Sequence, residues 1–160
     1  MITIDDDKIM PPNLVADLLG ASREHPGWII GYRGWEMVSR GDELAFGRGW
    51  QRATPDSPPE RLFFPGNGGV LYPPRSLHPT VHDIDTAMEL APSSDDIWFW
   101  ACSILNGTRR KCIGGAAHVS VRGQKGTPAL NAVNATNDER HFEAVIDHFG
   151  LRESLLKAIT

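Results

Sequence analysis

Short apolar runs and helically spaced apolar positions alternate along the chain and predict its strands and helices. Residues 2–4 form an apolar run that predicts a short buried strand, and residues 11–25 carry aliphatic side chains at helical spacing behind two prolines. Residues 28–39 predict one or two strands broken at Gly31 and Gly34. Further strands are expected within residues 61–77, 109–115 and 117–121, and further helices within 79–92, 93–107 and 137–159. This order predicts an α/β or α+β fold, a mixed sheet flanked by helices, in one domain spanning residues 1–160.

The helix expected over residues 79–92 carries Val81, Ile84 and Met88 at a helical interval. Side chains at this spacing share one face of a helix. We therefore expect these three side chains to face the core.

The composition narrows the classes of function. The chain has 160 residues, of which 41% are hydrophobic and 22% charged, and its formal net charge is -4 without a polybasic block, which argues against nucleic acid as the main partner. No apolar stretch reaches the roughly 18 residues that a membrane span needs, so we expect no membrane span and a cytoplasmic location. The two cysteines form no CxxC pair and predict neither a disulfide framework nor a thiolate zinc site.

Three consecutive carboxylates, Asp5, Asp6 and Asp7, follow the first predicted strand. In an extended chain Asp5 and Asp7 project to one side and Asp6 to the other. Two carboxylates at a strand end can share a hard divalent cation such as Mg²⁺ or Mn²⁺, because these ions prefer oxygen ligands. The alternative is a solvated acidic turn ahead of the helix, and the residues alone leave both interpretations open.

A second acidic pair, Asp95 and Asp96, opens the helix expected over residues 93–107. The helix dipole alone explains carboxylates in a first turn. If one of them points into a cleft, it can instead act as a general base on an attacking hydroxyl. The aromatic residues 98–100 follow at once, and because three successive residues on a helix cannot all face one core, at least one is expected to line a sugar-stacking surface.

Gly66, Gly68 and Gly69 gather between the two strands expected within residues 61–77. Glycine permits positive φ and lets a backbone approach a ligand closely. Taken alone, the pattern favours a hairpin turn or a bulge over a ligand site.

The order of these segments along the chain is a more specific signature of a protein family than any single segment. The stretches ITIDDDKIMPPNLVADLL, GYRGW, GNGGVLYPP, SSDDIWFW and GTPALNAVNATND together resemble the later part of a family of bacterial glycosyltransferases with the GT-A fold, of the type involved in capsular and other surface polysaccharides. The resemblance runs from about residue 2 to residue 150. Its most specific pieces are the strand-DDD-PP opening and the succession from GGVLYPP to DDIW.

The resemblance implies a nucleotide-sugar donor whose diphosphate is held by Mn²⁺ or Mg²⁺ at a DxD motif. That motif falls on Asp5 and Asp7 of this chain. The resemblance further implies that Asp96 is the catalytic base, with Asp95 as the alternative.

The same resemblance implies contacts to the sugars. Gly68 and Gly69 would lie under the donor sugar or the acceptor. Trp98 and Trp35 are the residues that would contact the saccharide acceptor.

The chain departs from the family in one respect. In GT-A enzymes the strands that bind the nucleoside precede the DxD motif, whereas here the motif begins at residue 5, as in a trimmed enzyme or a natural short protein that keeps the acceptor-side part. The strand at residues 2–4 would then lie at a sheet edge with unpaired backbone groups and apolar faces. We therefore expect a homodimer or a larger homo-oligomer to cover this edge.

We predict metal-dependent transfer of a sugar from a nucleotide-sugar to an acceptor hydroxyl, by this chain or by the enzyme of which it is a fragment. The alternative is a non-catalytic sugar- or protein-binding oligomer on a degenerate glycosyltransferase scaffold, which the missing nucleotide-binding half favours. A small metal-dependent phosphohydrolase has only the acidic cluster in its favour.

Overall fold

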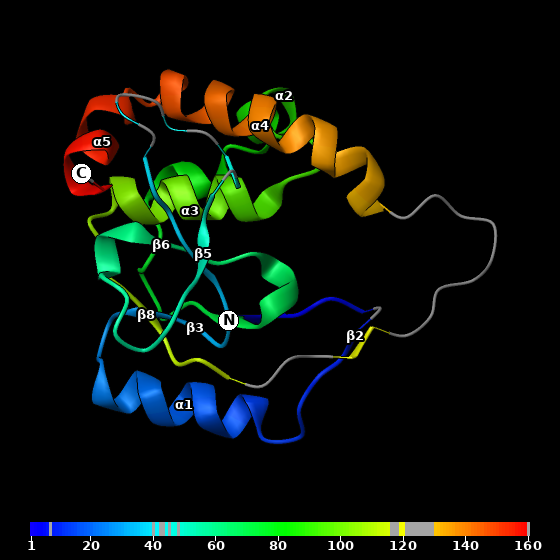
Figure 1. The fold of residues 1–160 in the computed structure, drawn as a ribbon, viewed down its shortest axis with the longest axis vertical. Coiled ribbons are helices and arrows are strands. Elements are labelled where there is room, and N and C mark those ends of the chain that lie inside the picture. Colours follow the sequence, from blue (N-terminus) through cyan, green and yellow to red (C-terminus); the bar gives the residue numbers. More distant parts are fainter. Residues whose placement is uncertain are drawn as a thin grey trace.

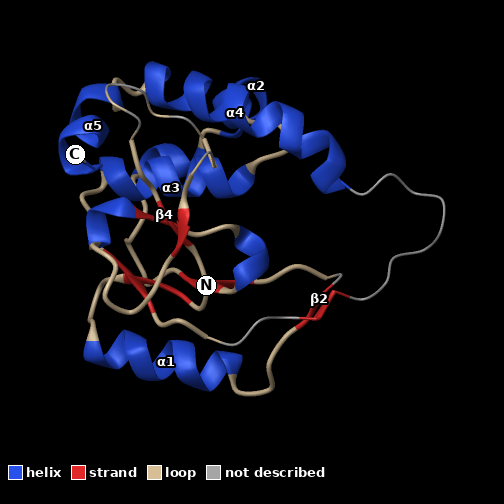
Figure 2. Ribbon diagram, viewed as in Figure 1, coloured by secondary structure: helices blue, strands red, loops and turns tan. Residues whose placement is uncertain are grey.

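The chain folds as layers of helices and small sheets (Figure 1). The computed structural model describes residues 1–6, 8–39, 41, 44, 46–47, 49–115, 119–120 and 130–159. The helices are α1 (Leu14–Glu24), α2 (Ile84–Leu90), α3 (Asp95–Leu105), α4 (Leu130–His148) and α5 (Arg152–Ile159). The strands are β1 (Ile2–Thr3), β2 (Lys8–Ile9), β3 (Ile29–Gly31), β4 (Trp35–Glu36), β5 (Gln51–Arg52), β6 (Leu62–Phe63), β7 (Val70–Leu71), β8 (Arg110–Cys112) and β9 (Val119–Ser120). The predicted mixed α/β fold is confirmed (Figure 2).

The largest sheet has the strand order β1-β7-β3-β8. Strand β3 is parallel to β8 and antiparallel to β7, and β7 is also antiparallel to β1. Strands β1, β3 and β8 therefore run in the same direction, and their carboxyl ends lie at the same edge of the sheet. Strand β1 stands at one end of the strand order, as expected for the residue 2–4 strand.

Helix α1 covers one face of this sheet (Figure 1). Its buried residues, Leu14 and Leu18, are four positions apart and so lie on one side of the helix. They form one cluster with three side chains of the sheet: Ile30, Tyr32 and Leu71. The amphipathic spacing that predicts this helix is thus the spacing that attaches it to the sheet.

The opposite face of the sheet packs towards a second sheet of order β5-β4-β6. The chain passes from β3 to β4 through Gly31 and Gly34, as the sequence pattern predicts. A Cβ atom on either glycine would come within 2.4 Å of the Phe64 ring, which is too close for any side chain. Glycine at these two positions therefore lets the Phe64 ring pack directly on the backbone.

Helix α3 lies between the strands and α4 (Figure 1). The Trp100 ring lies 5.2 Å from the ring of Phe142 on α4, and the Trp98 ring lies 5.4 Å from that of Phe149. Both tryptophans are 3% exposed, and Phe99 is partly buried against the same core. Because α3 has neighbours on several sides, all three aromatic residues contact apolar side chains. Trp98 and Trp100 line no open surface, whereas Phe99 stays partly exposed.

Helix α2 differs from the sequence prediction. Ile84 and Met88 are 63% and 58% exposed, so the prediction that they face the core is wrong. The spacing misleads because residue 81 belongs to a separate 3₁₀ turn, Pro79–His82, and the helix begins only after it. The residues of α2 that pack on the core are Ala87 and Leu90.

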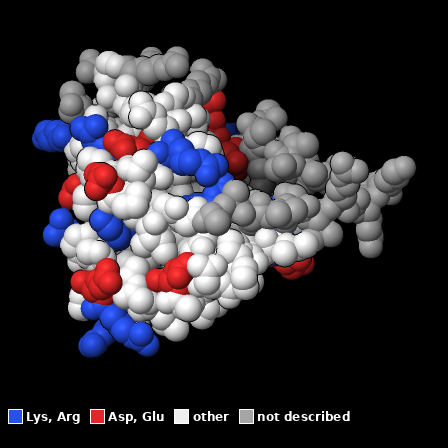
Figure 3. Space-filling view, turned by 60° about the horizontal axis from the view of Figure 1, so that its bottom comes forward, with Lys and Arg blue, Asp and Glu red and all other residues white. Residues whose placement is uncertain are grey.

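The surface carries charges of both signs. On the face drawn in Figure 3, basic and acidic side chains lie interspersed among uncharged ones. Among the helices of the described ranges, none combines the length and the apolar character that crossing a bilayer requires.

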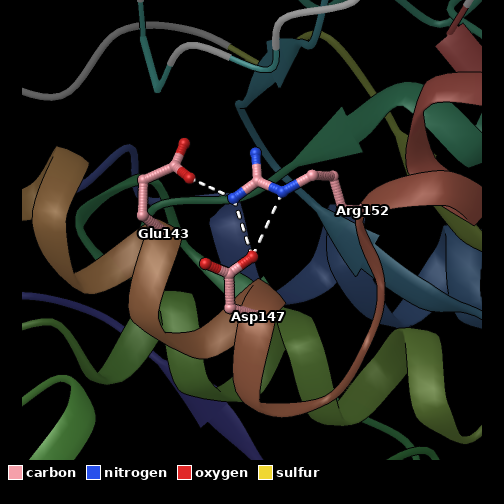
Figure 4. Close-up of polar contacts among 3 residues, drawn as sticks. All are labelled: Glu143, Asp147 and Arg152. Carbon is pink, nitrogen blue, oxygen red and sulfur yellow. Dashed lines mark hydrogen bonds and ion pairs between the residues drawn. The ribbon is translucent and has the colours of Figure 1, made fainter.

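A charged network joins the last two helices (Figure 4). The Arg152 guanidinium at the start of α5 donates to Glu143 and Asp147 of α4, and its Nε lies 3.1 Å from Asp147 Oδ1. Gly150, with φ of +63°, makes the turn between the two helices, a backbone conformation that favours glycine. The network therefore fixes the angle at which α5 leaves α4.

We expect Arg152→Ala to lower the free energy of unfolding by about 1 kcal/mol, because exposed pairs are individually weak but this arginine serves two carboxylates. Lys157→Ala is the matched control, since Lys157 pairs with one described carboxylate, Glu153, on the exposed side of α5, and its loss should cost roughly 0.3–0.5 kcal/mol. Urea unfolding monitored by tryptophan fluorescence measures both. Equal losses in the two variants would contradict a special role for Arg152.

Candidate functional site

Residues from several strands leave the four-stranded sheet at one edge, and Asp5 and the glycine turn are among them. Asp5 follows β1, Arg33 follows β3 and Gly114 follows β8, so all three leave the sheet at its carboxyl edge. Strand β7 runs the other way, so the glycine turn before it reaches the same edge. In α/β folds the carboxyl edge of the parallel strands is where ligands commonly bind.

The glycine turn is packed tightly against its neighbours. Residues Gly66–Gly68 form a 3₁₀ turn, and Gly69 follows with φ of +86°. A Cβ atom on Gly68 would lie 3.1 Å from the carbonyl oxygen of Arg33, and one on Gly69 would lie 2.8 Å from the side chain of Leu14. Close packing and positive φ thus account for both glycines, and a ligand is not needed to explain them.

The acidic pair lies directly beside this turn. The backbone amide of Gly66 hydrogen-bonds the Asp96 carboxylate, and the amide of Ile97 donates to its Oδ1 at 2.9 Å. The structure therefore brings together two candidate sites, the glycine turn and the first turn of α3, that are some thirty residues apart in the sequence.

Asp96 has a strongly perturbed acidity. Burial and, after it, the charge of Asp95 raise the pKa of Asp96 from 3.8 to about 7. Asp138 raises it further, and the two backbone hydrogen bonds oppose the shift. A carboxyl group with a pKa near neutrality can accept a proton from a substrate at physiological pH, which suits a general base.

Asp95 and Tyr72 complete this cluster. Asp95 is exposed at the start of α3, whereas Asp96 is half-buried. Burial raises the pKa of the Tyr72 phenol, and the charges of Asp96 and Asp95 raise it further. The two carboxylates and the phenol therefore share one electrostatic environment, in which Asp96 is the group held near its titration point.

A polar network behind Asp96 has no counterpart in the sequence prediction. The Ser94 hydroxyl donates to Asp138 Oδ1 at 2.7 Å and lies 2.9 Å from His141 Nδ1. Ser94 and His141 are 3% and 2% exposed. Because the hydroxyl proton points at Asp138 and the group is covered, the network anchors α4 on the start of α3 and is not arranged as a nucleophile with its base. It also places the charge of Asp138 close to Asp96.

The sequence-predicted metal ligands are placed only in part. Asp5 is half-buried at the carboxyl edge, Asp6 is exposed, and Asp7 lies outside the described residues. Among the described residues, which exclude Asp7, no group of three histidine, cysteine, aspartate or glutamate side chains is arranged to hold a metal ion. The oxygen donor at Asp5 suits Mg²⁺ or Mn²⁺ in kind, so the metal site stays a prediction.

The two tryptophans predicted to contact an acceptor lie in different surroundings. Trp98 is buried, and its indole N–H points at the Val81 carbonyl oxygen 3.5 Å away, so its ring has no open face for a sugar in this conformation. Trp35 on β4 is 39% exposed. Of the two, only Trp35 offers a ring surface to a ligand.

Comparison of the chain with models of known protein families, with curated proteins and with solved structures found no significant match. The functional argument therefore rests on the geometry of the site and on the motifs of the sequence.

The raised pKa of Asp96 makes stability depend on pH. An acid whose pKa is higher in the folded than in the unfolded state holds its proton longer when folded, so stability falls as pH rises from about 4 to about 7. Asparagine resembles the protonated acid. We expect Asp96→Asn to be more stable than the parent at pH 8, by up to about 4 kcal/mol, with the difference shrinking towards pH 4.

The measurement is the free energy of unfolding in urea at several pH values between 4 and 8. Asp85→Asn is the matched control, because Asp85 is an exposed carboxylate in the first turn of α2. Its difference from the parent should change little over this range. A difference for Asp96→Asn that does not vary with pH would show that its pKa is not raised.

Proposed function

We propose that this chain is a glycosyltransferase-like protein that transfers a sugar from a nucleotide-sugar to an acceptor hydroxyl with the help of Mn²⁺ or Mg²⁺. The observation that carries the proposal is the position of Asp96. A half-buried carboxyl group with a pKa near 7 lies on the glycine turn, at the same sheet edge where Asp5 emerges. The resemblance of the motifs to GT-A enzymes supports the same reaction.

In this proposal Asp5 and Asp7 hold the metal ion. When bound, a divalent cation there neutralises the charge that develops on the leaving diphosphate. Asp5 stands two residues beyond Thr3, which pairs with Val70 of β7. This register brings Asp5 to the side of the glycine turn, and Gly68 and Gly69 accordingly lie near the donor sugar.

Asp96 takes the proton of the acceptor hydroxyl in this proposal. Its pKa lies close enough to physiological pH for the ionised form to be populated, and the buried surroundings make that form a stronger base than an exposed aspartate. Asp95 is the alternative base, because it is exposed and adjacent. Trp35 supplies an exposed aromatic surface for the acceptor.

A second candidate function is binding of a sugar or a protein without catalysis, on the same scaffold. Its support is the end position of β1 in the sheet, together with two exposed apolar side chains next to this strand. These are Met1 before the strand and Ile4 after it. We propose that a second copy of the chain covers this surface.

We also propose that the protein acts in the cytoplasm.

Isothermal titration calorimetry with Mn²⁺, followed by UDP-sugars and other nucleotide-sugars, tests the metal site. We expect Mn²⁺ to strengthen the binding of a nucleotide-sugar to the parent, and the double variant Asp5→Asn/Asp7→Asn to lose that gain. The double variant Asp85→Asn/Glu89→Gln removes the same charge from the exposed side of α2 and should keep it. Absence of metal and donor binding in the parent would favour the non-catalytic function.

The oligomeric state tests the proposed role of β1. We expect a homodimer or larger homo-oligomer by light scattering at micromolar concentration, because apolar side chains beside a strand at the end of a sheet favour association. Ile4→Lys places a charge next to β1 and should shift the protein towards monomer. Ile84→Lys on α2 is the control, since Ile84 is equally exposed elsewhere. A monodisperse parent monomer would contradict the proposal.

A further inference from the structure

A hollow of about 280 Å³ opens beside the candidate site, at the carboxyl edge of β3 and β8. Three segments that are distant in sequence line it. They are Arg33 and Gly34 after β3, Arg52 to Pro55 at and after β5, and Gly114 and Gly115 after β8. Pockets for whole drug-sized ligands are usually about 300–1,000 Å³, so this hollow suits one group of a ligand.

Two guanidinium groups line the same hollow. Burial lowers the pKa of Arg33, and the positive charge of Arg52 lowers it further, which places the two groups within reach of each other's field. Because both groups line the hollow, an anion in it would meet two positive charges. Arginine is well suited to this task, because its planar fork of N–H donors matches phosphate oxygens.

A third cation stands at the rim. The Lys111 ammonium group donates to the carbonyl oxygen of Pro55 at 2.6 Å, and Pro55 is one of the lining residues. This bond holds the charge of Lys111 close to the hollow. In the part of the chain that the structure describes, Arg33, Arg52 and Lys111 therefore lie in or beside the hollow.

The two glycines shape the hollow but do not supply its donors. A Cβ atom on Gly115 would overlap the Tyr32 ring, and one on Gly114 would lie 3.0 Å from Pro55. The Gly115 amide already donates to the Tyr32 carbonyl oxygen at 2.7 Å, and the Gly114 amide bonds to Cys112. Recognition of an anion here falls to the arginine side chains.

An exposed aromatic ring adjoins the basic residues. Trp35 lies directly opposite Arg52 on the neighbouring strand, so the two side chains share one face of the second sheet. A sugar or a base joined to a phosphate in the hollow could stack on this ring.

We infer that this hollow binds a phosphate or diphosphate group of a sugar- or nucleoside-bearing ligand, through Arg33 and Arg52 and without a metal ion. The inference goes beyond the metal site at Asp5 and Asp7, and it stands on separate residues. Two ligands carry this chemistry: a nucleoside diphosphate and a sugar phosphate.

Calorimetry with sodium pyrophosphate in the presence of EDTA tests the site, since EDTA removes any contribution from a metal. We expect the parent to bind pyrophosphate, with an affinity that falls as NaCl is raised. Arg52→Ala should weaken binding about tenfold or more, because a hydrogen bond to a charged group is lost. Arg52 is exposed, so this variant is expected to fold.

Three further variants sharpen the result. Arg23→Ala removes one exposed positive charge from the end of α1, and it should leave the affinity within about twofold of the parent, since only long-range charge is lost. Arg33→Lys keeps the charge but not the planar fork and should weaken binding, with thermal unfolding as the check on its fold. Asp5→Asn/Asp7→Asn should bind pyrophosphate as the parent does, which separates this site from the metal site.

The same titration with UDP and with glucose 1-phosphate identifies the source of the group. Tighter binding of UDP assigns the hollow to a nucleotide, and tighter binding of glucose 1-phosphate assigns it to a sugar phosphate; both outcomes support the anion site. Absence of pyrophosphate binding in the parent, or equal weakening in Arg52→Ala and Arg23→Ala, would overturn the inference.

Discussion

The burial of the first turn of α3 is the constraint on which the rest of the structure depends. Helix α3 lies between the strands and α4, so its amino end has to meet the glycine turn on one side and Ser94, Asp138 and His141 on the other. An amino end in this position has backbone donors that need acceptors. Asp96 accepts from Ile97 and from Gly66, and in doing so joins the helix to the turn.

The same turn contacts two of the groups of residues described above. It bonds Asp96 through the Gly66 amide, while Gly68 packs against the Arg33 carbonyl oxygen. The backbone that carries Arg33 to the hollow and the carboxylate of Asp96 are therefore both held against one turn of a few residues.

The sequence predicts the individual helices and strands better than the contacts between them. The spacing of Leu14 and Leu18 predicts α1, and the glycines at 31 and 34 predict the break between β3 and β4, because these signals are local. The helix over residues 79–92 shows the limit of such reasoning. The spacing of the apolar residues predicts one helix that includes residue 81. In the structure, residue 81 lies in a separate 3₁₀ turn and the helix begins after it. On this shorter helix the side chains of Ile84 and Met88 are exposed to solvent.

The candidate site shows the same limit over longer distances. Asp95 and Asp96 are visible in the sequence as an acidic pair, but nothing local tells which of them is buried. Ser94 meets Asp138 and His141 across 44 and 47 residues, and Arg33 meets Arg52 only because β4 turns back on β5. Such contacts depend on how whole helices and strands pack together, and no short sequence motif predicts them.

The cost of keeping Asp96 where it is favours a role in chemistry over a role in folding. Asp95 already places a negative charge at the amino end of α3, where the helix dipole favours it. Asp95 is exposed, so its charge is not desolvated. A neutral asparagine or serine could accept the same two backbone hydrogen bonds without the penalty of burying a charge beside two other carboxylates. A residue whose structural role a neutral side chain could fill at lower cost is typical of functional sites, where the surrounding fold holds a reactive group at an unfavourable pKa. Asp96 meets this description, whereas close packing and the positive φ of Gly69 account for Gly68 and Gly69.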